Sequence, residues 1–367
     1  MARKLKWDKL LFLATLLLIG ASVVMVYSAS AVLAMERYQQ PPYWFLFKQV
    51  TWAVLGLFTL TLVMRVDYWN FKQPIVIWTA LGVCGLALIA VLFSDPINGA
   101  RRWFALGGIG VQPSELAKLV VVLFTAAVLE RRMDRINEVS FSLVPIVIVA
   151  GGISGLILLE PDFGTALALL LIVGVMVFAA GLNYRYMLGV GIGLLPLLYM
   201  VIAIEEYRRD RLLAFLNPWA DPLGDGFQII QSQIAVGTGG VFGRGLMAGV
   251  QKLFYLPEPH TDFIYAVIAE ETGLIGATAI VLCFCVLTWR GLRIAVRAPD
   301  RFGTFLALGL TTMVAAQAFV NISVVLGLLP TTGIPLPFVS AGGSSLLISL
   351  LSVGILLNIS QHASPDA

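Results

Sequence analysis

Long apolar segments constrain this chain more than any other feature of its sequence. A helix needs about twenty apolar residues to cross the ~30 Å hydrocarbon core of a bilayer. Such segments cover residues 10–34, 45–64, 74–93, 114–129, 142–159, 163–182, 187–204, 263–289, 303–329 and 341–359. Each should be helical, because backbone groups in lipid must satisfy one another's hydrogen bonds. The sequence therefore predicts an all-α integral membrane protein with about ten transmembrane helices.

Basic residues predict how these spans are oriented, because Lys and Arg concentrate in short cytoplasmic loops. With the N-terminus in the cytoplasm, fourteen of the 24 basic side chains fall on that side. They are Arg3, Lys4, Lys6, Lys9, Arg65, Lys72, Arg131, Arg132, Arg135, Arg185, Arg290, Arg293, Arg297 and Arg301. We therefore expect both termini to be cytoplasmic. The first span should be retained, because its apolar run is too long for a signal peptide.

The net charge of +3 comes from loops that face the membrane surface, so it indicates membrane lipid rather than nucleic acid as a partner. Cys84, Cys283 and Cys285 all fall inside spans, which indicates neither a disulfide framework nor a zinc site. No internal repeat is evident, so an inverted-repeat transporter gains no support. We expect one polytopic membrane domain over residues 1–367.

The longest connection, residues 205–262, is expected to be an extracytoplasmic loop that contains short amphipathic helices. Phe227, Ile230 and Ile234 recur at helical spacing, a pattern typical of a helix at the membrane interface. The glycine-rich run 237–245 could hold phosphate through its backbone amides, but it lacks the ending of a nucleotide loop, so a flexible loop is favoured. A second outer loop, residues 330–340, is too rich in proline to be helical and is not assigned to catalysis.

Asp262 stands immediately before the apolar run that begins at Phe263, and two interpretations of it remain open. Aspartate is a favoured N-cap residue, because its carboxylate accepts hydrogen bonds from the first free amides of a helix. An ionised carboxylate at a membrane surface could equally act as a general base toward a sugar hydroxyl. Lys252, Glu258 and His260 crowd the same approach, which favours a functional site there.

Glu258, His260 and Asp262 alternate, so an extended strand would bring their side chains to one edge as metal ligands. This spacing matches no strong metal motif. A divalent ion held loosely by Asp262 and Glu258 and shared with a substrate phosphate, Mg²⁺ or Mn²⁺, is the other alternative. No cofactor is assigned from the sequence.

Further charged residues near the spans have open roles. Arg101 and Arg102 precede Trp103, and they could bind a diphosphate or anchor the chain at headgroup depth. Glu115 and Lys118 share one helix face inside a span. Such charges are costly in lipid unless they pair or line a wet cavity, and a structural pair is favoured.

Carboxylates also lie at two other places near the predicted outer surface. Glu160 and Asp162 occupy the short turn between the fifth and sixth spans. Glu270 lies about two turns inside the eighth span and about 80° round the helix from Asp262, whereas Glu271 is on the opposite face. Of these two glutamates, only Glu270 is expected to share a cavity with Asp262.

Five motifs, in order over the ten spans, carry a resemblance to a known family. They are Asn98-Gly-Ala-Arg-Arg-Trp103, Gln112-Pro-Ser-Glu-Leu-Ala-Lys118, Glu160-Pro-Asp-Phe-Gly-Thr165, Leu256-Pro-Glu-Pro-His-Thr-Asp-Phe-Ile264 and Pro335-Leu-Pro-Phe-Val-Ser-Ala-Gly-Gly-Ser-Ser345. With them the chain resembles the SEDS family (shape, elongation, division and sporulation), to which FtsW and RodA belong. Ala341 departs from the usual Tyr before Gly-Gly-Ser-Ser. Segments such as 251–257 look more like the division-type FtsW, whereas residues 332–337 look more like the elongation-type RodA, and the division type is favoured.

The resemblance implies a peptidoglycan glycosyltransferase that polymerises lipid II at the outer face of the bacterial cytoplasmic membrane. Asp262 falls on the position of the family's catalytic carboxylate. The resemblance further implies a class B penicillin-binding protein, a transpeptidase, as partner. The residues expected to bind substrate are Arg101, Arg102, Glu115, Lys118, Asp162, Arg208, Lys252, Glu258, His260, Thr261 and Glu270.

We expect a single displacement with inversion at the donor sugar, in which Asp262 removes the proton from the 4-hydroxyl of the acceptor sugar. Cationic groups such as Arg102, Lys252 or Arg208 would stabilise the departing polyprenyl diphosphate. Two alternatives remain, a flippase that transports lipid II across the membrane and a division scaffold without catalytic activity.

Overall fold

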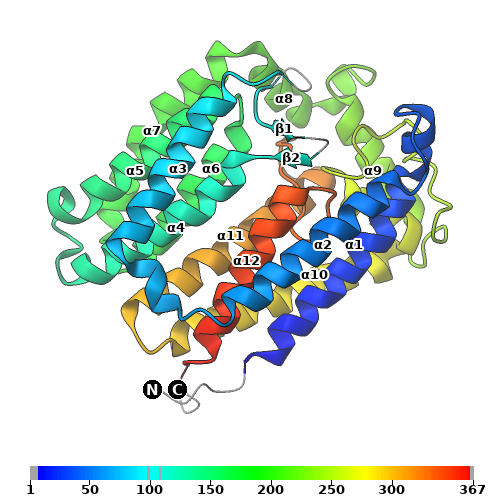
Figure 1. Cartoon of the computed structure of the whole chain (residues 1–367). Helices are drawn as coiled ribbons and strands as arrows, with labels where there is room; N and C mark the ends of the chain where they lie inside the picture. The colour runs from blue at the N-terminus through cyan, green and yellow to red at the C-terminus, as the bar shows by residue number, and fades with distance from the viewer. Residues whose placement is uncertain (1–6, 97–99, 107–108, 364–367) are drawn as a thin grey trace.

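Each of the ten apolar segments forms a helix of one bundle in the computed structural model, which describes residues 7–96, 100–106 and 109–363 (Figure 1). The helices are α1 (Lys9–Glu36), α2 (Trp44–Val63), α3 (Pro74–Val91), α4 (Pro113–Arg132), α5 (Val139–Leu159), α6 (Phe163–Ala179), α7 (Tyr184–Ile204), α10 (Ile264–Arg297), α11 (Arg301–Val325) and α12 (Gly343–Ser360). The prediction of an all-α membrane protein with about ten spans is therefore confirmed.

Within the described residues, eight of these helices are long and apolar enough to cross a membrane. The remaining two are α6, which has 17 residues, and α4, which carries Glu115 and Lys118. α1 packs against α10 and α2 through buried residues that include Leu18 and Val26, so the first span is an integral part of the bundle. The chain is a multi-pass membrane protein.

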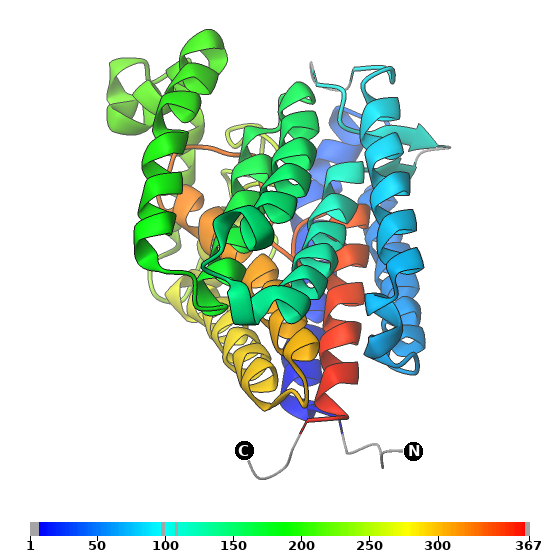
Figure 2. The ribbon, with the colours of Figure 1, turned by 90° about the vertical axis from the view of Figure 1, so that its left-hand side faces the viewer.

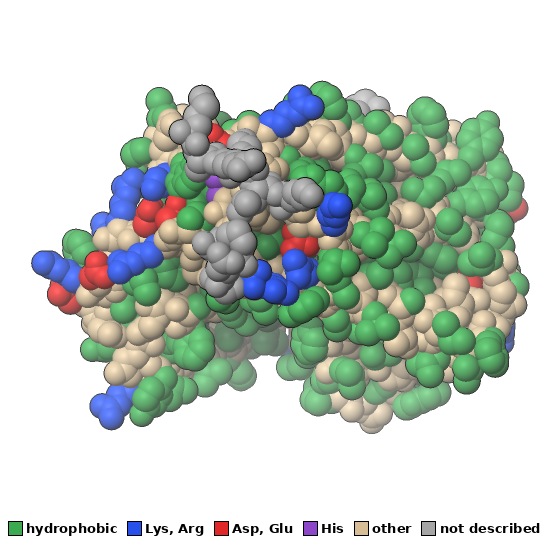
Figure 3. Space-filling view, turned by 90° about the horizontal axis from the view of Figure 1, so that it is seen from below, with side chains coloured by type: hydrophobic (Ala, Val, Ile, Leu, Met, Phe, Trp, Pro, Cys, Tyr) green, Lys and Arg blue, Asp and Glu red, His purple; other side chains and the backbone are tan. Residues whose placement is uncertain are grey.

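Both termini lie at one end of the bundle (Figure 2). The basic residues that were expected to share a side also lie at this end, because they occupy the ends of α2, α4 and α10 and the starts of α1, α7 and α11. Lys and Arg side chains gather around the termini when the molecule is seen from that end (Figure 3). Arg3, Lys4 and Lys6 lie outside the described residues.

The opposite end of the bundle carries most of the short elements (Figures 1 and 2). Strands β1 (Phe104–Leu106) and β2 (Ile109–Val111) form an antiparallel hairpin just before α4. α8 (Glu206–Leu216), a 3₁₀ turn at Pro218–Ala220 and α9 (Phe227–Gly239) follow α7. Two further 3₁₀ turns, Tyr68–Lys72 and Met133–Arg135, lie at the end that holds the termini. The short helix predicted from Phe227 is present as α9, whereas its position at the membrane interface stays a prediction. Its buried face includes Ile229, Ile230 and Ala235, whereas Ile234 is exposed.

α10 is interrupted at Gly273, whose backbone is non-helical (φ 66°, ψ −165°). The amides of Arg244 and Gly245 donate to the carbonyl oxygens of Glu270 and Glu271 (both 3.0 Å). In the other direction, the amide of Leu274 donates to the Gly240 carbonyl (2.9 Å). Residues 237–239 of the glycine run therefore belong to α9 and residues 240–245 form hydrogen bonds to the interrupted α10, so the prediction of a flexible loop there was wrong.

Replacing Gly243 by alanine is expected to destabilise this insert. Gly243 has φ +79°, and an added Cβ would collide with the Glu271 carbonyl oxygen. Strained backbone of this kind costs roughly 1–3 kcal/mol, so the midpoint of thermal unfolding in detergent should fall.

Gly237→Ala is the matched control, because Gly237 lies within α9 and an added Cβ meets open space. Alanine there should keep or raise the midpoint, since glycine inside a helix costs about 1 kcal/mol relative to alanine. Equal midpoints for the two variants would contradict this account of the α10 break.

Candidate active site

Asp262 lies at the end of the loop that leads into α10, but it does not cap that helix. α10 begins at Ile264, with Phe263 in the flanking position and no side-chain cap. No residue of the described ranges donates a hydrogen bond to the Asp262 carboxylate. The N-cap interpretation was therefore wrong, and the carboxylate makes no hydrogen bond that stabilises the start of α10.

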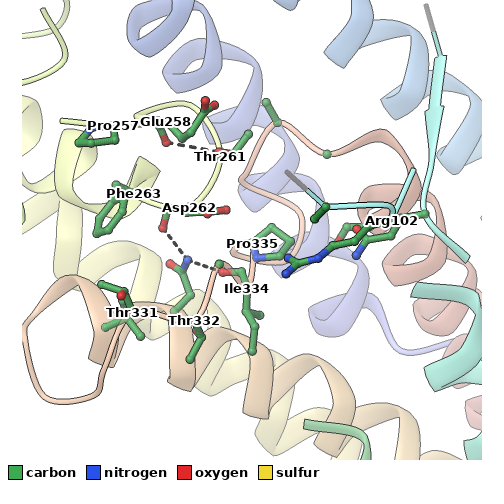
Figure 4. Close-up of a pocket in the computed structure, with 18 of the residues that line it drawn as sticks. Arg102, Pro257, Glu258, Thr261, Asp262, Phe263, Thr331, Thr332, Ile334 and Pro335 are labelled. Atoms are coloured by element: carbon green, nitrogen blue, oxygen red, sulfur yellow. Dashed lines mark hydrogen bonds between the residues drawn. The ribbon is translucent and has the colours of Figure 1, made fainter. Parts of the chain in front are cut away.

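The backbone of Asp262 is fixed by one side-chain amide. Asn321 on α11 donates from Nδ2 to the carbonyl oxygens of Asp262 and Ile334, both at 2.8 Å. This amide joins the Asp262 loop to the loop that follows α11 (Figure 4). The Ser340 hydroxyl, which donates to the Thr261 carbonyl (2.6 Å), links the same two loops.

The Asp262 carboxylate lines a pocket of about 510 Å³. Its walls come from six places in the chain: the β1–β2 region, α8, the start of α9, the loop 257–263, the end of α11 and the segment 331–345. Figure 4 shows Asp262 between Thr261 and the loop residues Thr332 and Ile334, with Arg102 entering from the side of the hairpin. The pocket is thus assembled at the end of the bundle away from the termini.

The loop 330–340, which the sequence did not assign to catalysis, forms one wall of this pocket. Thr331, Thr332 and Gly333 all line it, and a Cβ on Gly333 would stand 3.5 Å from Asp262 Oδ2. Ala341 lines the pocket as well, and its amide donates to the His260 carbonyl (2.9 Å). The loop therefore belongs to the candidate site.

Burial raises the pKa of Asp262 to about 6, and the nearby Glu258 adds to this rise. Arg211 and Arg102 act in the opposite direction, because a nearby cation favours the carboxylate. A carboxyl with this pKa is largely ionised at neutral pH and still accepts a proton readily. These are the properties of a general base.

Two arginines bring positive charge to the pocket. Arg102 Nε donates to the carbonyl oxygen of Glu160 (3.0 Å), and its guanidinium also bonds the Pro161 carbonyl. Arg211 on α8 lies 4.1 Å from the Tyr207 ring centre and donates to the Thr331 carbonyl (3.1 Å). Both are held by neutral partners, so within the described residues neither is neutralised by a carboxylate ion pair.

The Glu160 side chain beneath Arg102 is fully buried, and neither of its carboxyl oxygens has a hydrogen-bond partner among the described residues. Burial raises the pKa of Glu160 to about 8, and the neighbouring Asp162 raises it further. This pKa favours the neutral form of Glu160 at neutral pH. Only its backbone contributes to holding Arg102.

The other predicted arginines lie at the margin of the site. Arg208 borders a smaller cavity of about 140 Å³ that Arg102 and Arg211 also line, and its Nη1 donates to the Val201 carbonyl (2.8 Å). Arg101 is exposed and donates to the Leu92 carbonyl (3.0 Å), so it does not reach the pocket. Arg102 and Arg208 thus remain candidates for binding an anion.

The remaining predicted site residues are engaged within the protein and do not line the pocket. Lys252 is buried and pairs with Glu271 at 2.5 Å. Glu270 accepts the amide of Val250 (2.8 Å) and pairs with Arg244, so the structure does not place Glu270 in a cavity with Asp262.

Three more predicted residues are held in the same way. Glu115 and Lys118 form a buried pair at 2.7 Å, as the structural interpretation expected. Asp162 caps α6 by accepting from the Thr165 amide (3.1 Å), and it also accepts from Gln112 Nε2 (3.2 Å). Gln112 itself lines the pocket.

The loop 256–262 does not form the extended edge that a metal site would need. Glu258 has a positive φ of 47° and faces Arg37 (3.8 Å), whereas the buried His260 ring packs on Phe45 (4.5 Å between ring centres). Burial lowers the pKa of His260 to about 4. In the described part of the chain no three His, Cys, Asp or Glu side chains converge as metal ligands. The predicted trio does not fit a metal held by the protein alone.

An apolar groove of about 400 Å³ runs between α6 and α7. Its lining includes Phe163, Leu167, Leu171 and Leu197, and Phe163 also borders the small arginine cavity. That cavity in turn shares Arg102, Arg211 and the Thr331–Thr332 segment with the main pocket. The apolar groove, the arginine cavity and the Asp262 pocket therefore adjoin one another through shared lining residues.

Besides the loop 330–340, sequence reasoning missed Arg211, Tyr207 and Asn321 as residues of the site. Arg208 and Arg211 are three residues apart on a short helix, a spacing that puts two cations on one face. Asn321 is a polar residue within an apolar span, and polar groups at such positions are functional candidates. Both signals were present in the sequence.

Comparison with known proteins gives a consistent result. Residues 8–365 match the FtsW/RodA/SpoVE family, described as cell cycle protein. The chain is 43% identical to the probable peptidoglycan glycosyltransferase FtsW of Geobacter sulfurreducens, covering 97% of this chain and 96% of that protein. It is also 43% identical to the stage V sporulation protein E of Bacillus subtilis, covering 98% and 99%.

Solved structures agree with the sequence matches. A chain from a peptidoglycan synthase complex that coordinates polymerization and crosslinking has a TM-score of 0.80 at 30% identity, covering 98% of this chain and 99% of that one. The rod shape determining protein RodA of Thermus thermophilus has a TM-score of 0.71 at 29% identity, covering 98% of both. The identity to FtsW of Geobacter sulfurreducens (43%) is higher than the identity to RodA of Thermus thermophilus (29%), in agreement with the division-type resemblance of the sequence. The chain belongs to the FtsW/RodA/SpoVE family of cell cycle proteins.

Proposed function

We propose that this protein is a peptidoglycan glycosyltransferase that polymerises lipid II, with Asp262 as its general base. The observation that carries the proposal is a carboxylate free of hydrogen bonds that shares one pocket with two arginines, Arg102 and Arg211. Related FtsW proteins carry the name of this activity. The pocket would bring an acceptor hydroxyl and a diphosphate leaving group together.

In the proposed reaction, Asp262 takes the proton of the 4-hydroxyl on the acceptor sugar as that oxygen attacks the anomeric carbon of the donor sugar. The bond between the anomeric carbon and the diphosphate oxygen breaks, and polyprenyl diphosphate leaves with the electron pair. Arg102 and Arg211 would stabilise the charge that develops on the diphosphate. The lipid diphosphate is already activated, so no nucleotide is needed.

The groove between α6 and α7 supports a lipid-linked substrate. Its lining is apolar at membrane depth, and it adjoins the cavity of Arg102, Arg208 and Arg211, which in turn adjoins the pocket. A polyprenyl chain in the groove would place its diphosphate among the arginines and its sugar near Asp262. The same arrangement suits one molecule with an apolar tail, an anionic linker and a polar head.

The proposed orientation puts the end that holds both termini in the cytoplasm of a bacterium and the Asp262 pocket outside the cytoplasmic membrane. The gathering of basic side chains at the terminal end supports it. Residues 1–367 then form one membrane domain, with residues 205–262 as its long extracytoplasmic loop. A class B penicillin-binding protein is the proposed partner, because a solved relative belongs to a peptidoglycan synthase complex.

Replacing Asp262 by asparagine is expected to abolish polymerisation of purified lipid II in detergent. Asparagine keeps the size of the side chain but cannot take a proton at neutral pH. Because the carboxylate caps no helix, the thermal midpoint should stay close to that of the parent. Glycan strands formed at the parental rate would refute the role of base. A flippase or scaffold would form no strands even with the parent protein.

The polymerisation rate is expected to rise with pH through about 6, the pKa to which burial raises Asp262. The base acts only when ionised, so a raised pKa means that activity is lost on acidification at a higher pH than for an exposed aspartate. Initial rates measured between pH 5 and 8 at saturating lipid II test this. A flat profile over that range would exclude titration of Asp262 as the limiting group.

Arg211→Gln is expected to lower the turnover number roughly 10- to 100-fold, because one charge that stabilises the leaving group is removed. Arg101→Gln is the control, since Arg101 is exposed and lies outside the pocket. Steady-state kinetics on lipid II compare the two variants. A similar loss in both would show that Arg211 has no special part in the reaction.

A further inference from the structure

The segment that follows α9 contacts residues well inside the membrane-spanning helix α1 rather than residues at its end. Glu271 beside the α10 break accepts a hydrogen bond from Ser28 Oγ on α1 (2.7 Å). Ser28 lies eight residues before the end of α1 at Glu36, which is about 12 Å along a helix. The turn that bonds to Glu271 is therefore at a depth where α1 is still an apolar span.

The outer face of this segment is apolar. Phe242 is 82% exposed and Leu246 is 60% exposed, and they neighbour the exposed Leu274 and Ile275 of α10. Met247, Val250, Leu253, Phe254 and Tyr255 are exposed in the same segment. Such a run of exposed apolar side chains is not expected on a loop surrounded by water.

The polar groups of this segment turn toward the protein. Lys252 is buried and pairs with Glu271, and the amide of Met247 donates to the same carboxylate (3.0 Å). The amides of Val250 and Gln251 donate to Glu270. Non-helical backbone is tolerated at membrane depth only where its polar groups are satisfied by protein. The two glutamates and the α10 break supply partners for the amides of Arg244, Gly245, Met247, Val250 and Gln251.

We propose that residues 240–255 form a re-entrant turn in the outer leaflet, in which Phe242, Leu246 and Met247 contact lipid acyl chains. α9 leads into the leaflet along α10, the glycine run turns at Gly273, and residues 246–255 return to the surface. The exposed α10 residues Leu274 and Ile275 continue the same lipid-facing surface. The surface depends on the membrane spans and not on the catalytic role of Asp262.

Site-directed spin labelling tests the depth of this turn in nanodiscs. Single cysteines replace Leu246, Leu223 or Leu282 in a full-length chain whose Cys84, Cys283 and Cys285 have been changed to alanine. All three leucines are exposed in the structure. Leu223 belongs to the turn before α9 and is the water control, whereas Leu282 lies within α10 and is the lipid control. Collision rates with oxygen and with a water-soluble nickel chelate are measured by electron paramagnetic resonance.

The label at position 246 should resemble that at 282, with a high collision rate for oxygen and a low rate for the nickel chelate. A label at 246 that resembles position 223 would overturn the proposal. Low collision rates with both reagents would also overturn it, because protein rather than lipid would then cover the segment. Thermal midpoints of the labelled proteins verify that each variant is folded.

Discussion

Two adjacent buried glutamates on α10 hold the chain segment that delivers Asp262 to its pocket. Glu270 binds backbone amides at Val250 and Gln251, and Glu271 binds Lys252, Ser28 and the Met247 amide. Buried carboxylates persist only when charged or polar partners surround them. Apart from Ser28 on α1, these partners come from the one loop that returns to the surface, so the contacts that stabilise the two carboxylates also position that loop. Removal of either glutamate would free the segment that precedes the site.

The architecture could be predicted from the sequence because few backbone conformations can satisfy their own hydrogen bonds in the lipid bilayer. Apolar runs such as 303–329 must be helical in lipid, and the basic residues at their ends correctly indicated which ends lie together. The break at Gly273 could not be foreseen in this way. A glycine in an apolar span is ordinary, and the break is evident only when the run 240–245 is seen to supply the missing hydrogen bonds.

The candidate site could be predicted in part. Asp262, Glu258 and Thr261 line one pocket because they belong to one short loop, and Arg102 joins them from the hairpin. Glu270 was misplaced because the helical projection assumed that Asp262 belongs to α10, whereas the helix begins at Ile264. The 331–335 wall was missed because its side chains are uncharged. It contributes shape through Gly333 and backbone groups, which a search for reactive side chains does not detect.

Glu160 lies beside Arg102 but does not neutralise its positive charge, which the residue types alone would not suggest. The carboxyl lies next to Arg102, yet burial keeps it in the neutral form. Arg102 is held by hydrogen bonds to carbonyl oxygens and keeps its positive charge. Arg211 likewise donates to a carbonyl oxygen. These two cations attract an anionic group such as a diphosphate, and the Asp262 carboxylate in the same pocket offsets part of their charge. Discrimination among anionic lipids must therefore arise from the sugar-facing walls and the width of the α6–α7 groove, since attraction alone does not distinguish them.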